Sequence, residues 1–212
     1  MIDDLGDNSI IARQLLSLPG KMTAAILPHT PHAKLISKFA TKNGHEIIMH
    51  LPMEAFTRPD LLGPGALFSS MDKLTMNQTF DIDVASIPHI IGFNNHMGSL
   101  LTEDREKMRW ILEQAKSRSF FFLDSKTSQA SIAENLALEM GVPSIGRDIF
   151  LDHNVKLGSI EKQFAKLKRI ARKNGQVVVI CHPYPETLQF LEQNLASLEG
   201  EFELVGLSEL LN

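Results

Sequence analysis

The chain has 212 residues and a formal net charge of −4, with 43% hydrophobic and 22% charged residues. This composition is typical of a folded globular protein and excludes intrinsic disorder, and the length fits a single domain spanning residues 1–212. Since no basic run and no stretch of about 18 apolar residues occurs, we expect neither nucleic acid nor an anionic membrane surface as a partner, and no membrane span.

Short apolar runs alternate along the chain with longer amphipathic segments. No signal peptide is visible at the start, and Met1 and Ile2 are too few residues for a strand, so we expect the first strand to be truncated. Runs that are too short for helices and rich in branched or aromatic residues predict further strands. They lie at residues 22–27, 46–49, 89–93, 120–123, 142–145, 176–181 and 202–205.

Apolar residues at helical spacing predict helices at 102–117, 159–173 and 186–198, with others near 77–85 and before Met140. The segment 102–105 resembles a capping box. Residues 61–70 contain two glycines and a proline and read as a long loop that forms part of a pocket wall. The alternation of strands and helices predicts an α/β fold with a mostly parallel sheet, either open or closed into a barrel.

Polar side chains gather where the predicted strands end, which in parallel α/β folds is the edge that carries the site. The opposite edge receives mainly glycine, lysine and asparagine. The residues at the carboxyl ends are Asp3, Asp4, His29, His50, Asn94, Asn95, His96, Asp124, Arg147, Asp148 and His182.

The adjacent aspartates Asp3 and Asp4 pose an electrostatic problem. If both face one pocket, each raises the pKa of the other, and both stay ionised only if a cation or several donors compensate them. Together with His50 and His96 they make a set of nitrogen and oxygen ligands that suits Zn²⁺ first, with Fe, Mn, Co or Ni as alternatives. A divalent cation would allow both carboxylates to remain charged.

Each residue also has a purely structural interpretation. Asp3, Asp4 and Asp124 are residue types that cap helices or form turns. Arg147 and Asp148 form a structural ion pair in that reading, and His182 is a histidine at the edge of the core rather than a general acid. The convergence of so many on one edge favours the functional interpretation.

Other chemistries have less support in the sequence. Neither G-x-x-x-x-G-K-[S/T] nor G-x-G-x-x-G occurs, so a nucleotide phosphate site is not expected. G-x-S-x-G is absent as well, which disfavours a serine hydrolase. Cys181 is the only cysteine, and it adjoins His182 in a strand, where neighbours point to opposite faces and cannot form a catalytic pair.

As a set, six motifs in this order resemble the divergent polysaccharide deacetylase family: I-D-D-L-G at 2–6, H-L-P-M-E at 50–54, G-F-N-N-H-M-G-S at 92–99, D-S-K-T at 124–127, R-D-I-F-L-D at 147–152 and C-H-P at 181–183. The resemblance covers nearly the whole chain. It implies an irregular, NodB-like (β/α) barrel of about seven mostly parallel strands.

The resemblance also implies roles for individual residues. It makes Asp3 the catalytic base, His182 the general acid, and Asp4 and His50 metal ligands. The second histidine of the family's H-x-x-x-H motif is Glu54 here, so we expect His96 as the third ligand with Glu54 as the alternative. Arg147 and Asp148 resemble a pair that tunes a catalytic residue. The usual Arg-x-Pro-Tyr segment is missing, which leaves the metal, Asn94, Asn95 or backbone amides to stabilise an oxyanion. The residues expected to bind substrate or to support the ligands are Glu54, Asn94, Asn95, Asp124 and Arg147.

The implied function is a zinc-dependent hydrolase that removes acetyl groups from N-acetylated polysaccharide or cell-wall sugars. Its partner would be a carbohydrate, no protein partner is inferred, and its place would be the cell envelope or the outside. The alternatives are a glycan-binding or regulatory module of the same fold without turnover, and a metal-dependent glycosidase or phosphoesterase. The position of Glu54 discriminates the first two, because a carboxylate that closes the metal's coordination shell would favour binding over catalysis.

Overall fold

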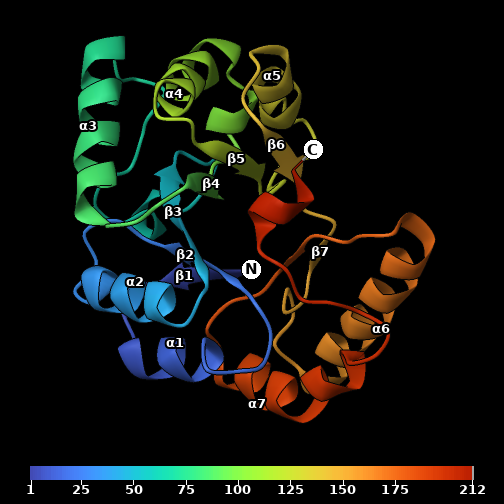
Figure 1. Cartoon of the computed structure of the whole chain (residues 1–212). Coiled ribbons are helices and arrows are strands. Elements are labelled where there is room, and N and C mark those ends of the chain that lie inside the picture. Colours follow the sequence, from blue (N-terminus) through green and yellow to red (C-terminus); the bar gives the residue numbers. More distant parts are fainter. Residues whose placement is uncertain (212) are drawn as a thin grey trace.

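Six parallel strands form the central sheet of the protein, in the spatial order β1-β2-β3-β4-β5-β6 (Figure 1). The computed structural model describes residues 1–211. The strands are Ile2–Leu5 (β1), Thr23–Ile26 (β2), Glu46–Met53 (β3), Gly92–Met97 (β4), Phe121–Asp124 (β5) and Ser144–Gly146 (β6). Every pairing in this sheet is parallel, so all carboxyl ends meet at one edge.

A second, two-stranded parallel sheet continues the first around a ring. It pairs Ile149–Phe150 (β7) with Val179–Ile180 (β8). The Asp3 N–H donates to the Cys181 carbonyl at 2.8 Å, and the Cys181 N–H donates to Met1, so β8 lies beside β1. Within residues 1–211 no ladder joins β6 to β7, which leaves the ring open there. The predicted α/β barrel of mostly parallel strands is therefore confirmed.

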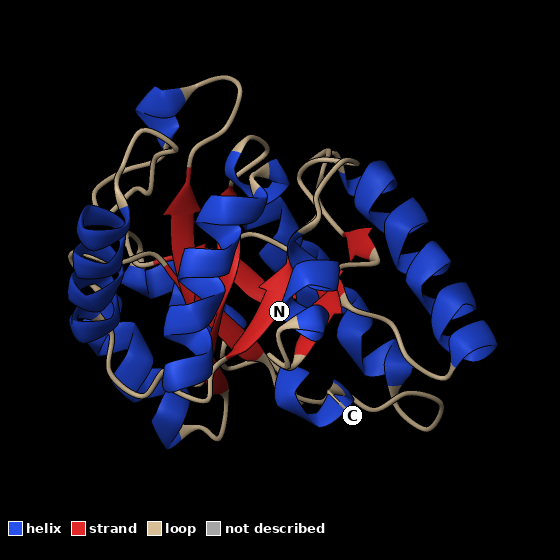
Figure 2. Ribbon diagram, turned by 90° about the horizontal axis from the view of Figure 1, so that it is seen from above, coloured by secondary structure: helices blue, strands red, loops and turns tan. Residues whose placement is uncertain are grey.

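Helices surround the strands on the outside, as the view from above in Figure 2 shows. They are Ser9–Leu15 (α1), Ala33–Lys42 (α2), Lys73–Ser86 (α3), Arg105–Ser117 (α4), Ala133–Glu139 (α5), Leu157–Asn174 (α6) and Pro185–Asn194 (α7). Short 3₁₀ turns occupy Pro59–Leu61, Leu101–Glu103, Leu195–Leu198 and Leu207–Leu210. Among residues 1–211, no helix combines the length and the apolar character that crossing a bilayer requires.

The core lies between the sheet and this helical layer. Phe80, Phe93 and Phe122 are fully buried, and their rings follow one another with centroids 5.7 and 4.9 Å apart. The apolar face predicted for α4 is buried as expected, at Met108, Ile111, Leu112 and Ala115. These contacts fix the helices on the sheet and hold its carboxyl edge in place.

Three strand predictions were wrong in their bounds, and the errors matter for the site. Asp3 and Asp4 lie inside β1 rather than after it, and β3 continues through Pro52 to Met53. Proline is tolerated there because β2 ends its pairing at Met49, which leaves one side of β3 free of a ladder. The strand predicted at 89–93 begins at 92 and runs to Met97, so its polar residues stand in the strand.

The prediction of a strand at 202–205 was also wrong. Phe202 and Leu204 alternate as strand residues do and pack against the core. Among residues 1–211, however, the backbone of this segment makes only one hydrogen bond to the backbone of a neighbouring segment, from the Lys21 N–H to the Leu204 carbonyl. The alternating apolar residues are therefore buried by side-chain packing, although the segment is not paired as a strand.

Helix termini differ from the predictions in ways that capping explains. Asp104, and not Thr102, caps α4, because its carboxylate accepts from the backbone N–H of Glu106 and Lys107. Similarly, Asp72 caps α3 and extends it upstream of the predicted start. Helices α1 and α2 were not predicted. The buried residues of α2 are Ala33, Ile36, Ser37 and Ala40, at the i, i+3, i+4 and i+7 spacing of an amphipathic helix, so the signal for this helix is present in the sequence.

Candidate metal centre

A β-bulge at the start of the chain turns two adjacent aspartates toward the same edge. Ile2 pairs with Ala24 and Leu5 pairs with Ile26, so Asp3 and Asp4 together oppose one residue of β2. Asp4 adopts a left-handed backbone conformation with φ of 53°. In a regular strand these two side chains would point to opposite faces; the extra residue re-aims one of them.

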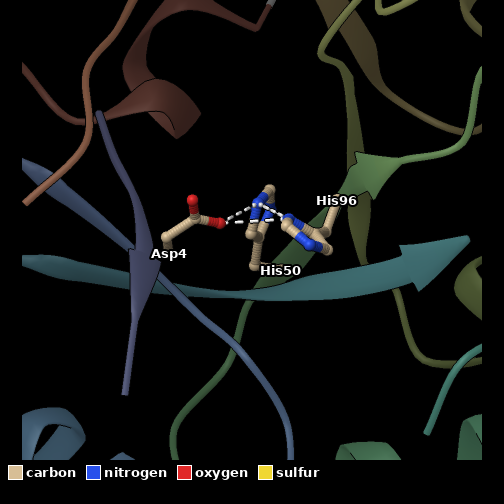
Figure 3. Close-up of side chains that lie close together, drawn as sticks. All are labelled: Asp4, His50 and His96. Carbon is tan, nitrogen blue, oxygen red and sulfur yellow. Dashed lines mark hydrogen bonds and ion pairs between the residues drawn. The ribbon is translucent and has the colours of Figure 1, made fainter. Parts of the chain in front are cut away.

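Three side chains, from β1, β3 and β4, meet at this edge (Figure 3). Oδ1 of Asp4 lies 3.1 Å from Nε2 of His50 and 3.0 Å from Nδ1 of His96. The two imidazole nitrogens are 3.1 Å from one another. Tetrahedral ligands at zinc–ligand distances stand about 3.3 Å apart, so the three atoms are spaced nearly as a zinc site requires.

The protons of the two imidazoles point away from this triangle. Nδ1 of His50 lies 2.8 Å from Oδ1 of Asn94, and Nε2 of His96 lies 3.3 Å from the Leu61 carbonyl. Since both oxygens are acceptors, each of these nitrogens donates, and the opposite nitrogen of the neutral ring keeps its lone pair. Oδ1 of Asp4 is buried, and beyond the two imidazole nitrogens no group within residues 1–211 donates a hydrogen bond to it. Three acceptor atoms therefore converge with no donor among them, an arrangement that fits a bound cation.

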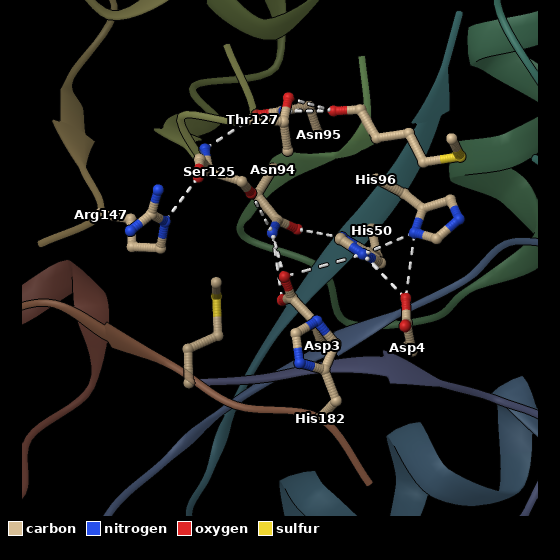
Figure 4. A network of polar contacts seen from close by, with 12 residues as sticks. Asp3, Asp4, His50, Asn94, Asn95, His96, Ser125, Thr127, Arg147 and His182 are labelled. Carbon is tan, nitrogen blue, oxygen red and sulfur yellow. Dashed lines mark hydrogen bonds and ion pairs between the residues drawn. The ribbon is translucent and has the colours of Figure 1, made fainter. Parts of the chain in front are cut away.

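Asn94 connects this triangle to the other aspartate (Figure 4). Its side-chain oxygen accepts from His50, while its Nδ2 donates to both carboxylate oxygens of Asp3 at 3.1 Å and to Oγ of Ser125 at 3.0 Å. All four side chains are buried. The amide thus fixes the tautomer and the ring orientation of His50, as partners of metal-ligating histidines commonly do.

Burial and the neighbouring charges shift the pKa values in opposite directions. Burial raises the pKa of Asp3 above its ordinary value. Burial acts in the same direction on Asp4, but when the imidazoles are protonated, hydrogen bonds and charge from His50 and His96 outweigh it and hold the pKa of Asp4 well below the usual range. Burial alone would lower the pKa of His50, yet the charges of Asp3 and Asp4 raise it. The two aspartates are therefore electrostatically different despite being neighbours.

His182 approaches the triangle from β8 and is held by Asp152. Its Nδ1 lies 2.8 Å from Oδ1 of Asp152, while its backbone N–H and the Thr187 hydroxyl donate to Oδ2. Burial opposes protonation of the imidazole, but Asp152 raises the pKa of His182 to about 9. The rings of Phe150 and Tyr184 flank it at 5.8 and 5.6 Å.

Asp148 was predicted to act in the catalytic centre by tuning a catalytic residue, and the structure places its side chain elsewhere. Its side chain is exposed, and its carboxylate accepts from the backbone N–H of Val178. Among the described contacts of His182, the carboxylate is that of Asp152, four residues later in the same motif. Asp152 is the last residue of the motif R-D-I-F-L-D. The prediction favoured Asp148 because it is the carboxylate nearest the strand end.

The other predicted polar residues support the loops around the site. Asp124 accepts from the Lys126 N–H and the Ser131 hydroxyl, which is the turn-forming role considered for it. Asn95 accepts from the Ser125 N–H. Arg147 donates to the Ser125 and Lys126 carbonyls and stacks on Phe150 at 3.8 Å, and burial lowers its pKa. These three residues hold the loop after β5 against the site.

Glu54 does not join the triangle. Its carboxylate accepts from the backbone N–H and the hydroxyl of Ser69, at 2.7 and 2.5 Å. It therefore fastens the segment 55–70, whose Leu61 carbonyl receives the proton of His96. Of the two expected third ligands, His96 is the one whose nitrogen lies with Asp4 and His50. The role of Leu61 rests on a backbone atom and leaves no sequence signal.

A second buried acidic residue lies under the same segment. Asp83 of α3 is fully buried, and its Oδ1 is 2.6 Å from Nε2 of His29, which follows β2. Burial raises the pKa of Asp83 to about 7. Gly65, with φ of +82°, approaches so closely that a Cβ atom there would lie 2.3 Å from Oδ1 of Asp83. Asp83 and His29 thus pack against the loop that contains Gly65.

Comparison with known proteins gives a consistent family assignment. The sequence model of the divergent polysaccharide deacetylase family matches residues 1–211. An uncharacterized protein of Haemophilus influenzae is 32% identical over 99% of this chain, and the uncharacterized protein YibQ of Escherichia coli is 33% identical over all of it. The matched regions make up 75% and 66% of those two proteins, so the chain spans only part of their length.

Solved structures show the same fold. An uncharacterized protein from Agrobacterium tumefaciens superposes with a TM-score of 0.93 at 23% identity, covering 99% of this chain and 87% of the other. A protein from Bacillus anthracis, described as a CE4 family pseudoenzyme, superposes with a TM-score of 0.54 at 13% identity, covering all of this chain and 65% of its own. At these identities the likeness concerns the fold alone.

Proposed function

Because the chain belongs to the divergent polysaccharide deacetylase family, we propose that it is a metal-dependent hydrolase that removes acetyl groups from N-acetylated polysaccharide or cell-wall sugars. The observation that carries the proposal is the convergence of three acceptor atoms, from Asp4, His50 and His96, without a donor among them. A base and an acid of opposite charge flank this triangle.

The proposed ligands are Asp4, His50 and His96, and Zn²⁺ is the cation that their nitrogen and oxygen donors suit best. When bound, such a cation acts as a Lewis acid that polarises a carbonyl group and lowers the pKa of water. Asn94 keeps the His50 proton on Nδ1, so that Nε2 remains a ligand atom. The Leu61 carbonyl does the same for His96.

Asp3 is the proposed general base. Its carboxylate is buried beside the triangle, with Oδ2 3.7 Å from Nε2 of His50. Asn94 holds both of its oxygens and thereby fixes its direction. In this position Asp3 accepts a proton from the water that attacks the acetyl carbon.

His182 is the proposed general acid. With a pKa of about 9 it carries its proton at neutral pH, and Asp152 stabilises the imidazolium. The proton passes to the amine nitrogen of the sugar as the carbon–nitrogen bond breaks. Cleavage would thus release acetate and leave a free amino sugar.

A glycan-binding module without turnover is the second candidate, and the pseudoenzyme of the same fold favours it. Glu54 argues against it, because its carboxylate is engaged by Ser69 and does not close the shell around the three ligand atoms. An open position is what a catalytic site requires. By resemblance to the family, we also propose that the protein acts in the cell envelope or outside the cell.

Acetate release from N-acetylated oligosaccharides tests this proposal directly. Protein treated with a chelator should be inactive and should regain activity with Zn²⁺, whereas His50→Ala should stay inactive with or without the metal. Zinc-loaded protein that binds the oligomers but releases no acetate would establish the binding module instead. Cleavage of glycosidic bonds in the same oligomers, without acetate, would assign a glycosidase.

A further inference from the structure

Helix α6 carries a line of cations on its outer face. Its 18 residues include six basic and one acidic side chain, although the chain as a whole has a net charge of −4. Figure 1 shows the helix at the outer edge of the molecule, far from α2. The four exposed cations on this face are named the α6 stripe: Lys162, Lys166, Arg169 and Lys173.

The spacing of the α6 stripe places its members together. Positions i, i+4, i+7 and i+11 of an α-helix fall within an arc of about 60° and extend over about 16 Å. A search for continuous basic runs misses such a pattern, because buried apolar residues such as Phe164 and Leu167 separate the cations. The helix therefore presents a narrow, straight row of positive charge.

No acidic partner neutralises this row. Within residues 1–211, the one α6 cation that forms an ion pair is Arg172, with Glu201. Lys168 instead lies over the ring of Phe164. The four members of the stripe make no ion pair, so their charge is available to a partner.

Two apolar side chains are exposed at the N-terminal end of the same helix. Val155 is 39% and Leu157 41% exposed, on either side of the exposed Lys156. At 100° per residue, however, Leu157 lies about 150° from the centre of the α6 stripe, and Val155 precedes the helix, so neither shares the face of the cations and contact with a partner at this face is electrostatic. Phe164, the one aromatic residue of α6, is buried, so the helix lacks the stacking platforms that flexible nucleic acids use.

We propose that the α6 stripe docks the protein on the surface of a bilayer that contains anionic phospholipids. A straight, exposed row of cations without a groove matches a flat field of negative headgroups. Each lysine close to such a surface adds to the electrostatic attraction, which decays within a Debye length. The docking is independent of the hydrolase proposed above.

Vesicle co-sedimentation tests this proposal with a matched pair of variants. The protein should pellet with phosphatidylcholine vesicles that contain about 30% phosphatidylglycerol, and about 0.5 M salt should release it. K162Q/K166Q/K173Q should weaken binding about 100-fold. The control K34Q/K38Q/K42Q removes three exposed lysines from one side of α2 and should bind nearly as the unaltered protein does.

Circular dichroism melts establish that both triple variants are folded. Equal binding to vesicles of phosphatidylcholine alone would overturn the proposal, and so would an equal loss of binding in the two variants. Retention of the protein on a soluble polyanion such as heparin, with no binding to anionic vesicles, would reassign the stripe to an anionic polymer and equally reject the bilayer.

Discussion

Asp152 holds His182 at two points, accepting from its backbone N–H at 2.6 Å and from its ring Nδ1 at 2.8 Å. The Thr187 hydroxyl donates to the same carboxylate, so the orientation of Asp152 does not depend on whether the imidazole is protonated. A histidine gripped in this way keeps one ring orientation. Its free nitrogen is the atom that can deliver a proton.

The pH dependence of deacetylation should report this contact. The pKa of His182 is raised to about 9, so the acid is protonated below that pH, and the rate should fall as the pH rises through about 9. Asp152→Asn removes the negative charge beside His182. The fall in rate at alkaline pH, called the alkaline limb of the pH–rate profile, should then move toward the ordinary histidine pKa of about 6.5. Rates of acetate release between neutral and alkaline pH measure the shift.

Thr187→Val is the control for the Asp152 variant, because it removes a hydrogen bond from the same carboxylate but leaves the charge. Its alkaline limb should stay near that of the unaltered protein. If the alkaline limb of Asp152→Asn coincided with that of the unaltered protein, His182 would not be the general acid.

The choice between His96 and Glu54 predicts different metal affinities. His96→Gln removes a nitrogen that lies 3.0 Å from Oδ1 of Asp4, and it should weaken zinc binding by at least about 100-fold. Glu54→Gln changes a side chain that is engaged by Ser69 and should alter affinity by less than about threefold. Competition with a coloured chelator gives both values; a comparable loss in the two variants would contradict the assignment.

Asn94 should control the affinity for the metal without touching it. Asn94→Leu keeps the branching and the number of heavy atoms of the side chain but removes the acceptor for His50 Nδ1, so the ring is free to turn and zinc affinity should fall about 10- to 100-fold. Ser125→Ala removes only a neighbouring acceptor of the same amide and should have a much smaller effect. Zinc titrations of both variants, at a temperature where both are folded, decide the point.

Two glycines of one loop predict different costs of adding a methyl group. Gly63 and Gly65 both have positive φ, at +74° and +82°, so alanine is strained at each by about 1 kcal/mol. A Cβ at Gly63 meets nothing within 4 Å, whereas at Gly65 it would collide with Asp83. Gly65→Ala should therefore lower the free energy of unfolding by about 1–3 kcal/mol more than Gly63→Ala, as urea denaturation measures.

Helices α1 and α2 and strand β7 were not predicted, but most strands and the long helices could be, because branched apolar runs and amphipathic segments alternate clearly. Their bounds could not, since β3 and β4 continue through residues that look like loop. The segment 202–205 has the alternation of a strand but packs without a partner. The alternation of apolar and polar residues indicates which side chains are buried. Whether a segment forms a paired strand depends also on the segments that lie beside it.

Most of the candidate site was also predictable, because polar side chains ending apolar strands are conspicuous. What the sequence could not contain is their relative direction. Strand alternation would have placed Asp3 and Asp4 on opposite faces, and only the bulge brings them to one edge. The α6 stripe was missed for a similar reason, because its cations become neighbours only once the segment is helical.

The left-handed backbone at Asp4 restricts which amino acids position 4 can accept. Aspartate and asparagine tolerate this conformation better than other side chains with a Cβ atom. Glutamate carries the same charge, but its extra methylene would push the carboxylate past the two imidazoles, and its backbone would resist the turn. The bulge of β1 therefore distinguishes aspartate from glutamate at position 4, both by backbone torsion and by side-chain length.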